Sequence, residues 1–355
     1  MKRIVLTGGG TAGHVTPNIA LLPHLLEDGY EVMYIGSYNG IEKALIEAEH
    51  IEYRGIASGK FRRNLSLKNI SDIGNVFKGI REAEKLLKEF APDVVFSKGG
   101  YVAVPVVRAA KKLKIPVIIH ESDMTPGLAN KLSFKAAKKI CCNFPETVAM
   151  LPKEKAVLSG SPIRAELLAG SREKGLEFTG LSGKKPILLM IGGSLGARAL
   201  NDALRQALPE LLKEFDVIHL CGKGNLAETL ETTEGYVQYE FIREELKDLF
   251  AASDVVFSRA GANAITELLA LKKPNLLVPL PKENSRGDQI LNAESFEKQG
   301  YSMVLSQADL TADTLVKAIR ELYANRDRYV EAMKKSPAVN GVDTILGLIR
   351  EITEG

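Results

Sequence analysis

Four glycines and a histidine crowd into one short segment near the N-terminus, "TGGGTAGHVTPNIALL". Gly8, Gly10 and Gly13 follow a hydrophobic run, and His14 comes directly after the last of them. Backbone N–H groups at the start of a helix bind phosphate, and glycines let the ligand approach the backbone closely. A histidine beside such a loop can accept a proton near neutral pH. The segment therefore predicts a phosphate contact next to a candidate general base, the alternative being a histidine bonded to backbone at a helix start.

The spacing Gly8-x-Gly10-x-x-Gly13 also matches the fingerprint of dinucleotide-binding domains. That fingerprint needs an acidic residue at the end of the second strand, where a carboxylate accepts hydrogen bonds from ribose hydroxyls. The expected second strand, residues 31–37, ends in "IGS", and its acid, Glu31, stands at its start. A nicotinamide-dependent oxidoreductase is therefore disfavoured, and we expect phosphate binding without adenosine.

A second glycine turn opens a helix late in the chain, in "SRAGANAITELL". Glu267 lies about two turns into that helix, where a carboxylate can accept both hydroxyls of a ribose. The alternative is a solvated glutamate on an exposed helix face. The downstream segment "SRGDQILNA" favours the first interpretation, so we expect the second half of the chain to bind a nucleotide.

The chain contains an internal repeat. Asp-Val-Val-Phe-Ser occurs twice, starting at Asp93 and at Asp254, and each copy precedes a basic residue, a glycine turn and a helical pattern. The segments "VLTGGGTAGH" and "LLMIGGSLGARALN" form a second matching pair. Alternating hydrophobic strands and helices form parallel sheets with crossover helices. We therefore predict an α/β protein with two Rossmann-like domains in tandem, against two chance copies of a common strand–turn–helix unit.

The predicted domain boundary follows "SGSP" at 159–162, which has the composition of a hinge. The first domain is expected over residues 1–162 and the second over residues 163–340. The tail 341–355 has hydrophobic residues at helical spacing. We expect this terminal helix to cross back to the first domain.

Composition and charge limit the class of protein. With 45% hydrophobic and 26% charged residues, the 355-residue chain is typical of a globular protein with more than one core. Residues 1–160 carry 23 lysines and arginines against 16 acids, so this half is expected to face an anionic ligand or surface. No stretch resembles a signal peptide or a membrane span of about 20 residues, which predicts a chain that stays on the cytoplasmic side. The three cysteines lack disulfide or metal spacing and are expected to be buried.

Residues 60–90 combine hydrophobic positions at helical spacing with a basic border. The hydrophobic positions are Leu67, Ile70, Ile73, Phe77 and Ile80, and the basic ones are Lys60, Arg62, Arg63, Lys68, Lys78 and Arg81. Such a segment binds anionic lipid without crossing the bilayer. It predicts a peripheral contact with an anionic membrane surface, the alternative being an ordinary amphipathic helix that packs on a core.

Six motifs together resemble the MurG family of cell-wall glycosyltransferases: "GGGTAGHVTPNIAL", "HESDMTPGLANK", "GSPIR", "GGSLGARALN", "SRAGANAITELL" and "DQILNAE". The resemblance implies the GT-B fold, in which two Rossmann-like domains face each other across a cleft. It implies an inverting hexosyltransferase that moves N-acetylglucosamine from UDP-N-acetylglucosamine to the C4 hydroxyl of MurNAc in undecaprenyl-diphospho-MurNAc-pentapeptide. Lipid I thereby becomes lipid II in peptidoglycan biosynthesis. It also implies a peripheral protein on the cytoplasmic side of the cell membrane that binds no nucleic acid.

The resemblance assigns roles to individual residues. His14 is the expected general base, and Glu121 is the second candidate. Donor-binding residues are expected to be Thr11, Ala12 and Gly13 of the acceptor-side glycine loop, with Arg164, Ser194, Ile242, Ala262, Asn263, Ala264, Glu267 and Gln289. Acceptor-binding residues are expected to be Gly10, Gly99, Gly100, Tyr101, Asp123 and Asn130. Many members have asparagine where this chain has Asp123, so the role of this residue stays open between a ligand contact and an alternative base.

The sequence contains no Asp-x-Asp, the usual carboxylate pair for a nucleotide-bound divalent metal, so no metal or other cofactor is expected. The charge on the leaving UDP is then expected to be stabilised by N–H groups at helix starts and by Arg164. Two alternatives stay open. One is another GT-B glycosyltransferase with a different lipid or small-molecule acceptor, and the other is a UDP-N-acetylglucosamine 2-epimerase.

Overall fold

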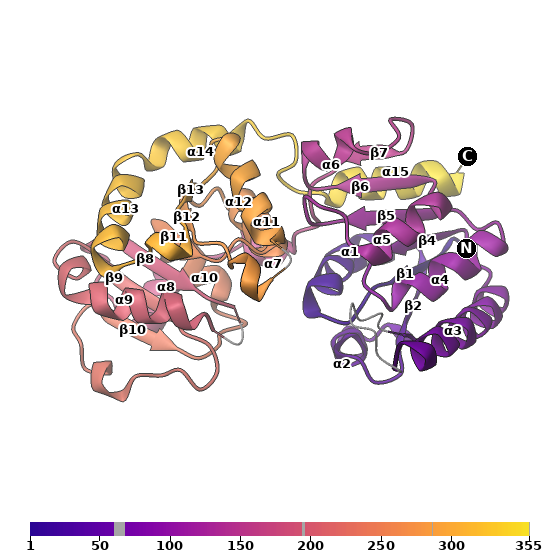
Figure 1. Ribbon diagram of the computed structural model, residues 1–355, viewed down its shortest axis with the longest axis horizontal. Coiled ribbons are helices and arrows are strands. Elements are labelled where there is room, and N and C mark those ends of the chain that lie inside the picture. The colour runs from indigo at the N-terminus through magenta and orange to yellow at the C-terminus, as the bar shows by residue number, and fades with distance from the viewer. Residues whose placement is uncertain (60–67, 194–195, 286, 355) are drawn as a thin grey trace. The chain divides into compact units, whose positions relative to one another are not determined.

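The chain forms two compact units in the computed structural model, which describes residues 1–59, 68–193, 196–285 and 287–354. The first unit comprises residues 1–164 together with 340–355, and the second comprises residues 165–339 (Figure 1). Each unit contains one parallel β-sheet with helices packed on it. The predicted α/β class with two Rossmann-like domains is therefore confirmed.

Seven parallel strands form the sheet of the first unit, in the order β3-β2-β1-β4-β5-β6-β7. The strands are β1 (Arg3–Thr7), β2 (Glu31–Ser37), β3 (Glu52–Ile56), β4 (Val94–Ser97), β5 (Val117–Glu121), β6 (Lys139–Cys142) and β7 (Ala156–Leu158). The strand order reverses direction between β1 and β4. Open α/β sheets bind ligands beyond the carboxyl ends of their strands at such a reversal.

Helices cover both faces of this sheet (Figure 1). One face packs against α1 (Thr16–Glu27) and α15 (Val342–Glu354), around a core that includes Leu6 and Leu25. The other face packs against α3 (Lys68–Phe90) and α4 (Ala103–Lys112), around Val95 and Val106. The shorter helices are α2 (Ile41–Glu47), α5 (Leu128–Ser133) and α6 (Pro145–Ala149). Burial on both faces explains why the central strands are continuous hydrophobic runs.

Helix α3 contains most of the segment predicted to contact a membrane. Of that segment, Lys60, Arg62, Arg63 and Leu67 lie outside the described residues, and so do the side chains of Lys68, Ile70 and Ile73. Phe77 is 62% exposed, whereas Ile80 packs against the core of the first unit. The prediction that Ile80 belongs to a lipid-facing stripe is therefore wrong, because α3 uses that edge to pack on α4 and the sheet.

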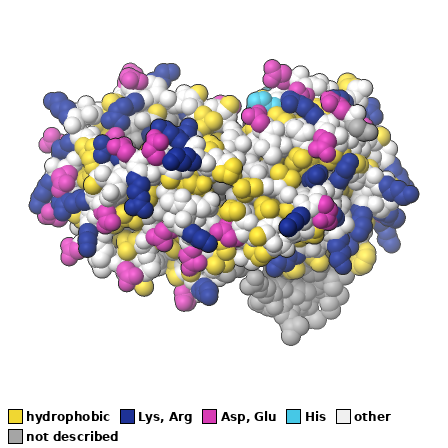
Figure 2. Space-filling model, turned by 90° about the horizontal axis from the view of Figure 1, so that it is seen from above, with side chains coloured by type: hydrophobic (Ala, Val, Ile, Leu, Met, Phe, Trp, Pro, Cys, Tyr) yellow, Lys and Arg dark blue, Asp and Glu magenta, His cyan; other side chains and the backbone are white. Residues whose placement is uncertain are grey.

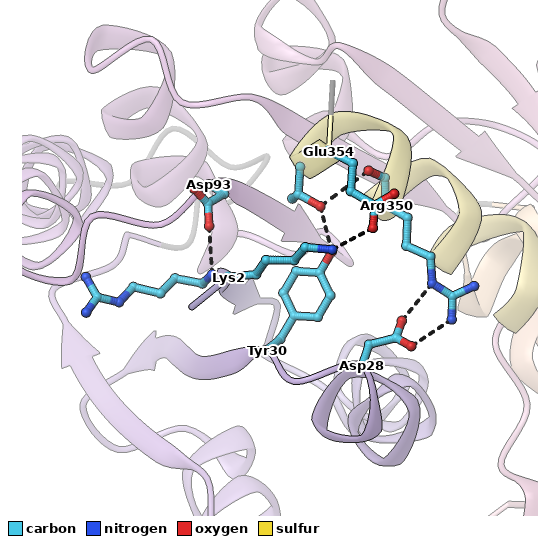
Figure 3. Close-up of polar contacts among 8 residues, drawn as sticks. Lys2, Asp28, Tyr30, Asp93, Arg350 and Glu354 are labelled. Atoms are coloured by element: carbon cyan, nitrogen blue, oxygen red, sulfur yellow. Dashed lines mark hydrogen bonds and ion pairs between the residues drawn. The ribbon is translucent and has the colours of Figure 1, made fainter.

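The C-terminal helix α15, yellow in Figure 1, returns to the first unit. Lys2 Nζ donates to Glu354 at 2.6 Å, and Arg350 forms two hydrogen bonds with Asp28 at 2.7 and 2.9 Å (Figure 3). Exposed ion pairs of this kind contribute little, about 0–1 kcal/mol each. The main attachment is hydrophobic, since Ile345 and its helical neighbours are buried in the same core as α1.

Six parallel strands form the sheet of the second unit, in the order β10-β9-β8-β11-β12-β13. The strands are β8 (Ile187–Ile191), β9 (Asp216–Leu220), β10 (Tyr236–Tyr239), β11 (Val255–Ser258), β12 (Asn275–Leu277) and β13 (Met303–Val304). The helices are α7 (Ala165–Leu168), α8 (Arg172–Thr179), α9 (Arg198–Leu211), α10 (Leu246–Ala252), α11 (Ala262–Ala270), α12 (Asp288–Lys298), α13 (Ala312–Ala324) and α14 (Arg326–Lys334). The first six strands of each sheet thus follow one topology, in which β1 corresponds to β8 and β4 to β11.

The repeated aspartate makes the same contact in both units. Asp93 accepts a hydrogen bond from the backbone N–H of Arg3 at 2.8 Å, and Asp254 accepts one from Ile187 at 2.8 Å. In each case the aspartate N–H donates back to the carbonyl of the same residue, at 2.9 and 2.8 Å. The aspartate therefore fixes the start of the fourth strand against the first, which explains its place at the beginning of each Asp-Val-Val-Phe-Ser copy.

Candidate active site

The first unit brings two glycine loops together at the carboxyl ends of β1 and β4. Gly100 has a φ of +81°, and a Cβ atom there would overlap the carbonyl oxygen of Gly9. The ring of Tyr101 lies where a Cβ on Gly10 would stand. The predicted acceptor residues Gly10, Gly99, Gly100 and Tyr101 therefore form one packed arrangement of backbone and ring.

Glu42 on α2 holds the first glycine loop and was not predicted as a site residue. Its side chain is fully buried and accepts hydrogen bonds from the N–H groups of Ser37 at 3.0 Å and Gly10 at 3.2 Å. One N–H donor of the loop is therefore bonded to a carboxylate within the fold. Glu42 does not fit the dinucleotide fingerprint, because it lies five residues beyond the second strand and its side chain reaches back to Ser37.

His14 ends a short 3-10 turn, Ala12–His14, directly before α1. The side chain is half-buried, and its Nδ1 lies 2.8 Å from the hydroxyl oxygen of Thr11. This contact orients the ring, and Nε2 is the nitrogen on the opposite side of it. Of the other predicted donor residues in this loop, Thr11 and Ala12 are exposed and Gly13 is half-buried.

Glu121 organises the loop that follows β5. Its buried carboxylate accepts hydrogen bonds from the N–H groups of Asp123 at 3.1 Å and Gly127 at 3.0 Å. It also accepts one from the amide of Asn130 at 2.9 Å, and that amide donates further to the carbonyl of His120 at 3.2 Å. Burial raises the pKa of Glu121. Glu121 and Asn130 therefore have internal partners that fix the backbone of residues 122–127, with Asp123 half-buried at its start.

Lys98 is a second residue that the sequence prediction missed. It follows β4, its side chain is 1% exposed, and its ammonium group donates a hydrogen bond to the hydroxyl of Ser122. Burial lowers the pKa of Lys98 to about 8, although the negative charges of Glu121 and Asp123 raise it. The available signal was the basic residue that follows both copies of the repeat, where the second unit has Arg259.

The second unit contains a pocket of about 550 Å³ at the carboxyl ends of its strands. It is lined by Gly192, Gly196, Ala197, Arg198, Ala199, Asp202, Arg259, Leu280, Gln289 and Gln307. The pocket opens at the start of the 14-residue helix α9, where unpaired N–H groups favour anions. Arg259 donates to the carbonyls of Val278 at 3.1 Å and Pro279 at 3.3 Å, and burial lowers its pKa.

Polar amides complete this pocket. Gln289 accepts a hydrogen bond from the N–H of Leu280 at 3.0 Å through its side-chain oxygen, which directs its NH₂ group elsewhere. The side-chain oxygen of Gln307 is buried and has no hydrogen-bond partner among the described residues. An unsatisfied buried acceptor is costly, so Gln307 is a candidate to accept a hydrogen bond from a bound ligand.

The other predicted donor residues are distributed around this pocket region or outside it. Ala262, Asn263, Ala264 and Glu267 lie on α11, which begins three residues after Arg259, and none of them is among the residues that line the pocket. Ile242 is half-buried after β10, and Arg164 is exposed at the end of the first unit's main segment. Ser194 lies outside the described residues.

Two further properties concern the described residues only. They contain no group of histidine, cysteine, aspartate and glutamate side chains that could hold a metal ion, and Cys141, Cys142 and Cys221 are buried free thiols. In the ranges that the structure describes, every helix is too short or too polar to span a bilayer.

Comparison with known families matches both units. Residues 4–142 match the glycosyltransferase family 28 N-terminal domain, and residues 187–346 match the glycosyltransferase family 28 C-terminal domain. The first match covers strands β1 to β6 and the second covers strands β8 to β13.

Two relatives and one solved structure are similar over nearly the whole chain. Proteins of Lachnospira eligens and Lachnoclostridium phytofermentans are each 62% identical, over 351 and 352 residues, with 99% of both chains covered. Both carry the name UDP-N-acetylglucosamine–N-acetylmuramyl-(pentapeptide) pyrophosphoryl-undecaprenol N-acetylglucosamine transferase. The crystal structure of Acinetobacter baumannii MurG is similar with a TM-score of 0.79 and 27% identity, and 99% of this chain and 100% of that one are covered.

Proposed function

This chain belongs to glycosyltransferase family 28, among the transferases that carry N-acetylglucosamine to pyrophosphoryl-undecaprenol-linked N-acetylmuramyl-pentapeptide, and from that premise we propose how its residues divide the reaction. The chain is a hexosyltransferase of peptidoglycan synthesis that moves N-acetylglucosamine from UDP-N-acetylglucosamine to undecaprenyl-diphospho-MurNAc-pentapeptide, so that lipid I becomes lipid II. The observation that carries this conclusion is the 62% identity to transferases of this name over 99% of the chain.

The second unit binds UDP-N-acetylglucosamine in this proposal. N–H groups at the start of α9 and the guanidinium of Arg259 supply positive potential for the diphosphate of the donor. The NH₂ group of Gln289 donates to a hydroxyl of the sugar, and Gln307 accepts from one. Of the remaining predicted donor residues, Glu267 accepts hydrogen bonds from the ribose hydroxyls, and the backbone of Ile242 contacts the uracil. Ser194, Arg164, Ala262, Asn263 and Ala264 contact the diphosphate and sugar.

The first unit binds the acceptor. Its site is the joined pair of glycine loops, with Tyr101 against Gly10 and with the loop held by Glu121 and Asn130 beside it. We assign Gly10, Gly99, Gly100, Tyr101, Asp123 and Asn130 to this acceptor site. The fold supports the assignment because the loops stand at the carboxyl ends of β1 and β4, where the strand order reverses.

His14 acts as the general base. The acceptor C4 hydroxyl has a pKa far above 7, so a base must take its proton as the new glycosidic bond forms, which typically contributes about 100- to 10,000-fold in rate. Nδ1 of His14 lies 2.8 Å from the hydroxyl oxygen of Thr11, and this contact holds the imidazole in one orientation within the glycine loop. Glu121 is the weaker candidate, since its carboxylate already accepts three hydrogen bonds within the first unit. Direct displacement by the C4 oxygen inverts the sugar carbon and releases UDP.

The protein also binds the cytoplasmic face of the cell membrane as a peripheral protein. Phe77 is 62% exposed on α3, and exposed Tyr38 lies beneath Lys78 Nζ, 5.9 Å from the ring centroid. Figure 2 shows lysine and arginine side chains along one edge of the first unit, with hydrophobic side chains between them. Exposed aromatic rings with adjacent cations are suited to a surface of anionic lipid.

Co-sedimentation with vesicles that contain anionic lipid tests the membrane contact. Replacing Arg62, Arg63 and Lys68 by glutamine is expected to reduce the bound fraction by about 10-fold or more, at about 1 kcal/mol per charge. The matched control replaces three exposed lysines of the second unit, Lys213, Lys223 and Lys334. Equal loss in both triple variants, or no loss in either, would contradict a membrane contact through residues 60–90.

Transfer of labelled N-acetylglucosamine from UDP onto a short-chain lipid I analogue tests the reaction. Incubation with UDP-N-acetylglucosamine alone is the control, because a 2-epimerase needs no second substrate. Hydrogen exchange with UDP present then tests the division of labour. Protection is expected at 196–199 and over α11, and protection confined to residues 8–14 would contradict the assignment of the donor to the second unit.

A further inference from the structure

Lys98 is buried at the centre of the first unit's site, in a position that exposes only 1% of its side chain. Its backbone N–H donates to the carbonyl of Thr7 at 2.8 Å, which fixes it between β1 and β4. Lysine is almost never fully buried without a partner, because removal of the ammonium group from water is costly. Lys98 therefore needs negative charges nearby to be retained in its charged form.

The titratable groups whose charges interact with Lys98 come from β5, from the loop that follows it and from β6. Glu121 ends β5 and Asp123 follows it, and both raise the pKa of Lys98. His120 is neutral at physiological pH, because burial and the Lys98 charge hold its pKa well below 6.5. Cys141 on β6 is a neutral thiol, because burial raises its pKa to about 12. The cluster thus consists of two carboxylates and one ammonium group.

Charge balance matters here because of the ligand. On the proposed function, the neighbouring glycine loops face the pyrophosphate of the acceptor, and like charges across a binding site lower affinity. Two carboxylates beside that site without a cation would repel the ligand. The ammonium group of Lys98 neutralises one of these two negative charges from within the fold. Its hydrogen bond to Ser122 fixes the residue between Glu121 and Asp123.

We propose that Lys98 is a positioning residue of the acceptor site, which holds Ser122 and balances the charge of Asp123 so that the loop can accept a prenyl diphosphate. Lys98 does not touch the ligand in this role, since its side chain is enclosed by the protein. The proposal rests on the assignment of the acceptor to the first unit. It explains how this chain retains an acid at position 123, where an uncompensated charge would weaken binding.

A double-mutant cycle tests the pairing of Lys98 with Asp123. Lys98→Met is expected to raise the KM for the lipid I analogue about 10- to 100-fold and to leave the KM for UDP-N-acetylglucosamine within about 2-fold. Asp123→Asn in the Lys98→Met background is expected to lower the acceptor KM below that of Lys98→Met, because it removes the uncompensated charge. A double variant that is no better than Lys98→Met, or a Lys98→Met enzyme with an unchanged acceptor KM, would overturn the proposal.

Lys273→Met is the matched control. Lys273 is half-buried, and burial lowers its pKa to about 8, but it lies in the second unit and donates to the carbonyl of Ser253 at 2.7 Å. This substitution removes an ammonium group with a similarly lowered pKa and leaves the residues of the acceptor site unchanged. A rise in acceptor KM that is equally large in Lys273→Met would assign the effect to general destabilisation and overturn the proposal.

A pH profile gives a second measurement that does not depend on Lys98→Met folding. Affinity of the wild type for a short-chain prenyl diphosphate, measured calorimetrically, is expected to fall about 10-fold between pH 7 and pH 9 as Lys98 loses its proton. Lys98→Arg is expected to keep its charge and show a smaller fall. A flat wild-type profile, an equal fall in Lys98→Arg, or no binding of the probe would overturn the proposal. Binding of the probe without sugar transfer would contradict the proposed function alone.

Discussion

Substitution of Gly100 by alanine tests whether the packed glycine loops set the geometry of the acceptor site. Gly100 has a φ of +81°, a region that residues with a Cβ atom rarely adopt. The added Cβ would also overlap the carbonyl oxygen of Gly9. That obstacle is backbone, which cannot move aside by a change of rotamer. Either the loop after β4 or the loop after β1 must therefore shift.

The magnitude follows from two separate costs. Left-handed backbone costs a non-glycine residue about 1–2 kcal/mol, and overpacking against atoms that cannot rotate away costs about 1–3 kcal/mol more. Together they predict a loss of about 2–5 kcal/mol, which lowers the Tm of a unit of this size by about 5–15 °C. A displacement of about 1 Å at the site is expected to cost about 100-fold in kcat/KM for the acceptor.

Differential scanning calorimetry and steady-state rates at varied acceptor concentration measure these effects. Gly347→Ala is the matched control, since Gly347 lies within helix α15 and nothing approaches its added Cβ within 4 Å. Alanine in a helix interior is expected to stabilise by about 0.5–1 kcal/mol relative to glycine. A Gly100→Ala enzyme with an unaltered Tm and an unaltered kcat/KM would refute the argument that these loops are rigidly packed.

Three further outcomes are expected. His14→Ala should reduce turnover at least about 100-fold with little change in the KM for UDP-N-acetylglucosamine, whereas His24→Ala in the following helix should not; near-normal turnover in His14→Ala removes it from the base role. Arg259→Lys should raise the KM for UDP-N-acetylglucosamine about 10-fold, because one ammonium group cannot replace a planar guanidinium bonded to two carbonyls; an unchanged KM excludes Arg259 from the donor site. Acid should destabilise the second unit, because burial lowers the pKa of His219 from 6.5 to about 3. Below pH 6.5 the unfolded chain binds a proton on this histidine, whereas folded His219 stays neutral. The contribution of neutral His219 to the free energy of unfolding is therefore complete above pH 6.5. Between pH 6.5 and pH 3 it decreases by about 1.4 kcal/mol per pH unit. Urea titrations at several values between pH 7 and pH 5 should show that the free energy of unfolding depends less steeply on pH in His219→Gln than in the wild type. An identical pH dependence contradicts this assignment.

The fold class could be predicted because it depends on short-range patterns. Hydrophobic runs that alternate with helices, and the second copy of Asp-Val-Val-Phe-Ser, indicate two parallel sheets. The second strand, expected over residues 31–37, is β2 (Glu31–Ser37) in the structure. Ile80 shows the limit of such patterns. Its helical spacing from Phe77 does not reveal which edge of α3 packs on α4 and which is left to solvent.

The buried polar residues of the first unit's site could not be predicted from local sequence. Glu42 looks like a helix glutamate in "NGIEKALIE", and only the fold brings it to the N–H of Gly10, 32 residues away. Lys98 is 24 residues from Ser122, its hydrogen-bond partner on the neighbouring strand end. The energy of a buried charge depends on partners that tertiary structure supplies. Predictions from motifs therefore miss residues such as Glu42 and Lys98, whose partners are distant in the sequence.

The two units use one scaffold in two ways, and the difference lies at corresponding positions. Asp93 and Asp254 make the same backbone contacts at the start of β4 and β11, so the strands that carry the next residues are held alike. At the other end of these strands the cation differs in its surroundings. Lys98 is enclosed and interacts electrostatically with two carboxylates, whereas Arg259 lines an open pocket at the start of α9. An enclosed cation can only adjust the charge of its own loop, while a cation in a pocket can bind an anion directly. If this distinction sets the roles of the two sites, Arg259→Met should weaken donor binding and Lys98→Met should weaken acceptor binding, each with the other KM unchanged. Kinetic effects that cross between the two substrates would contradict this separation.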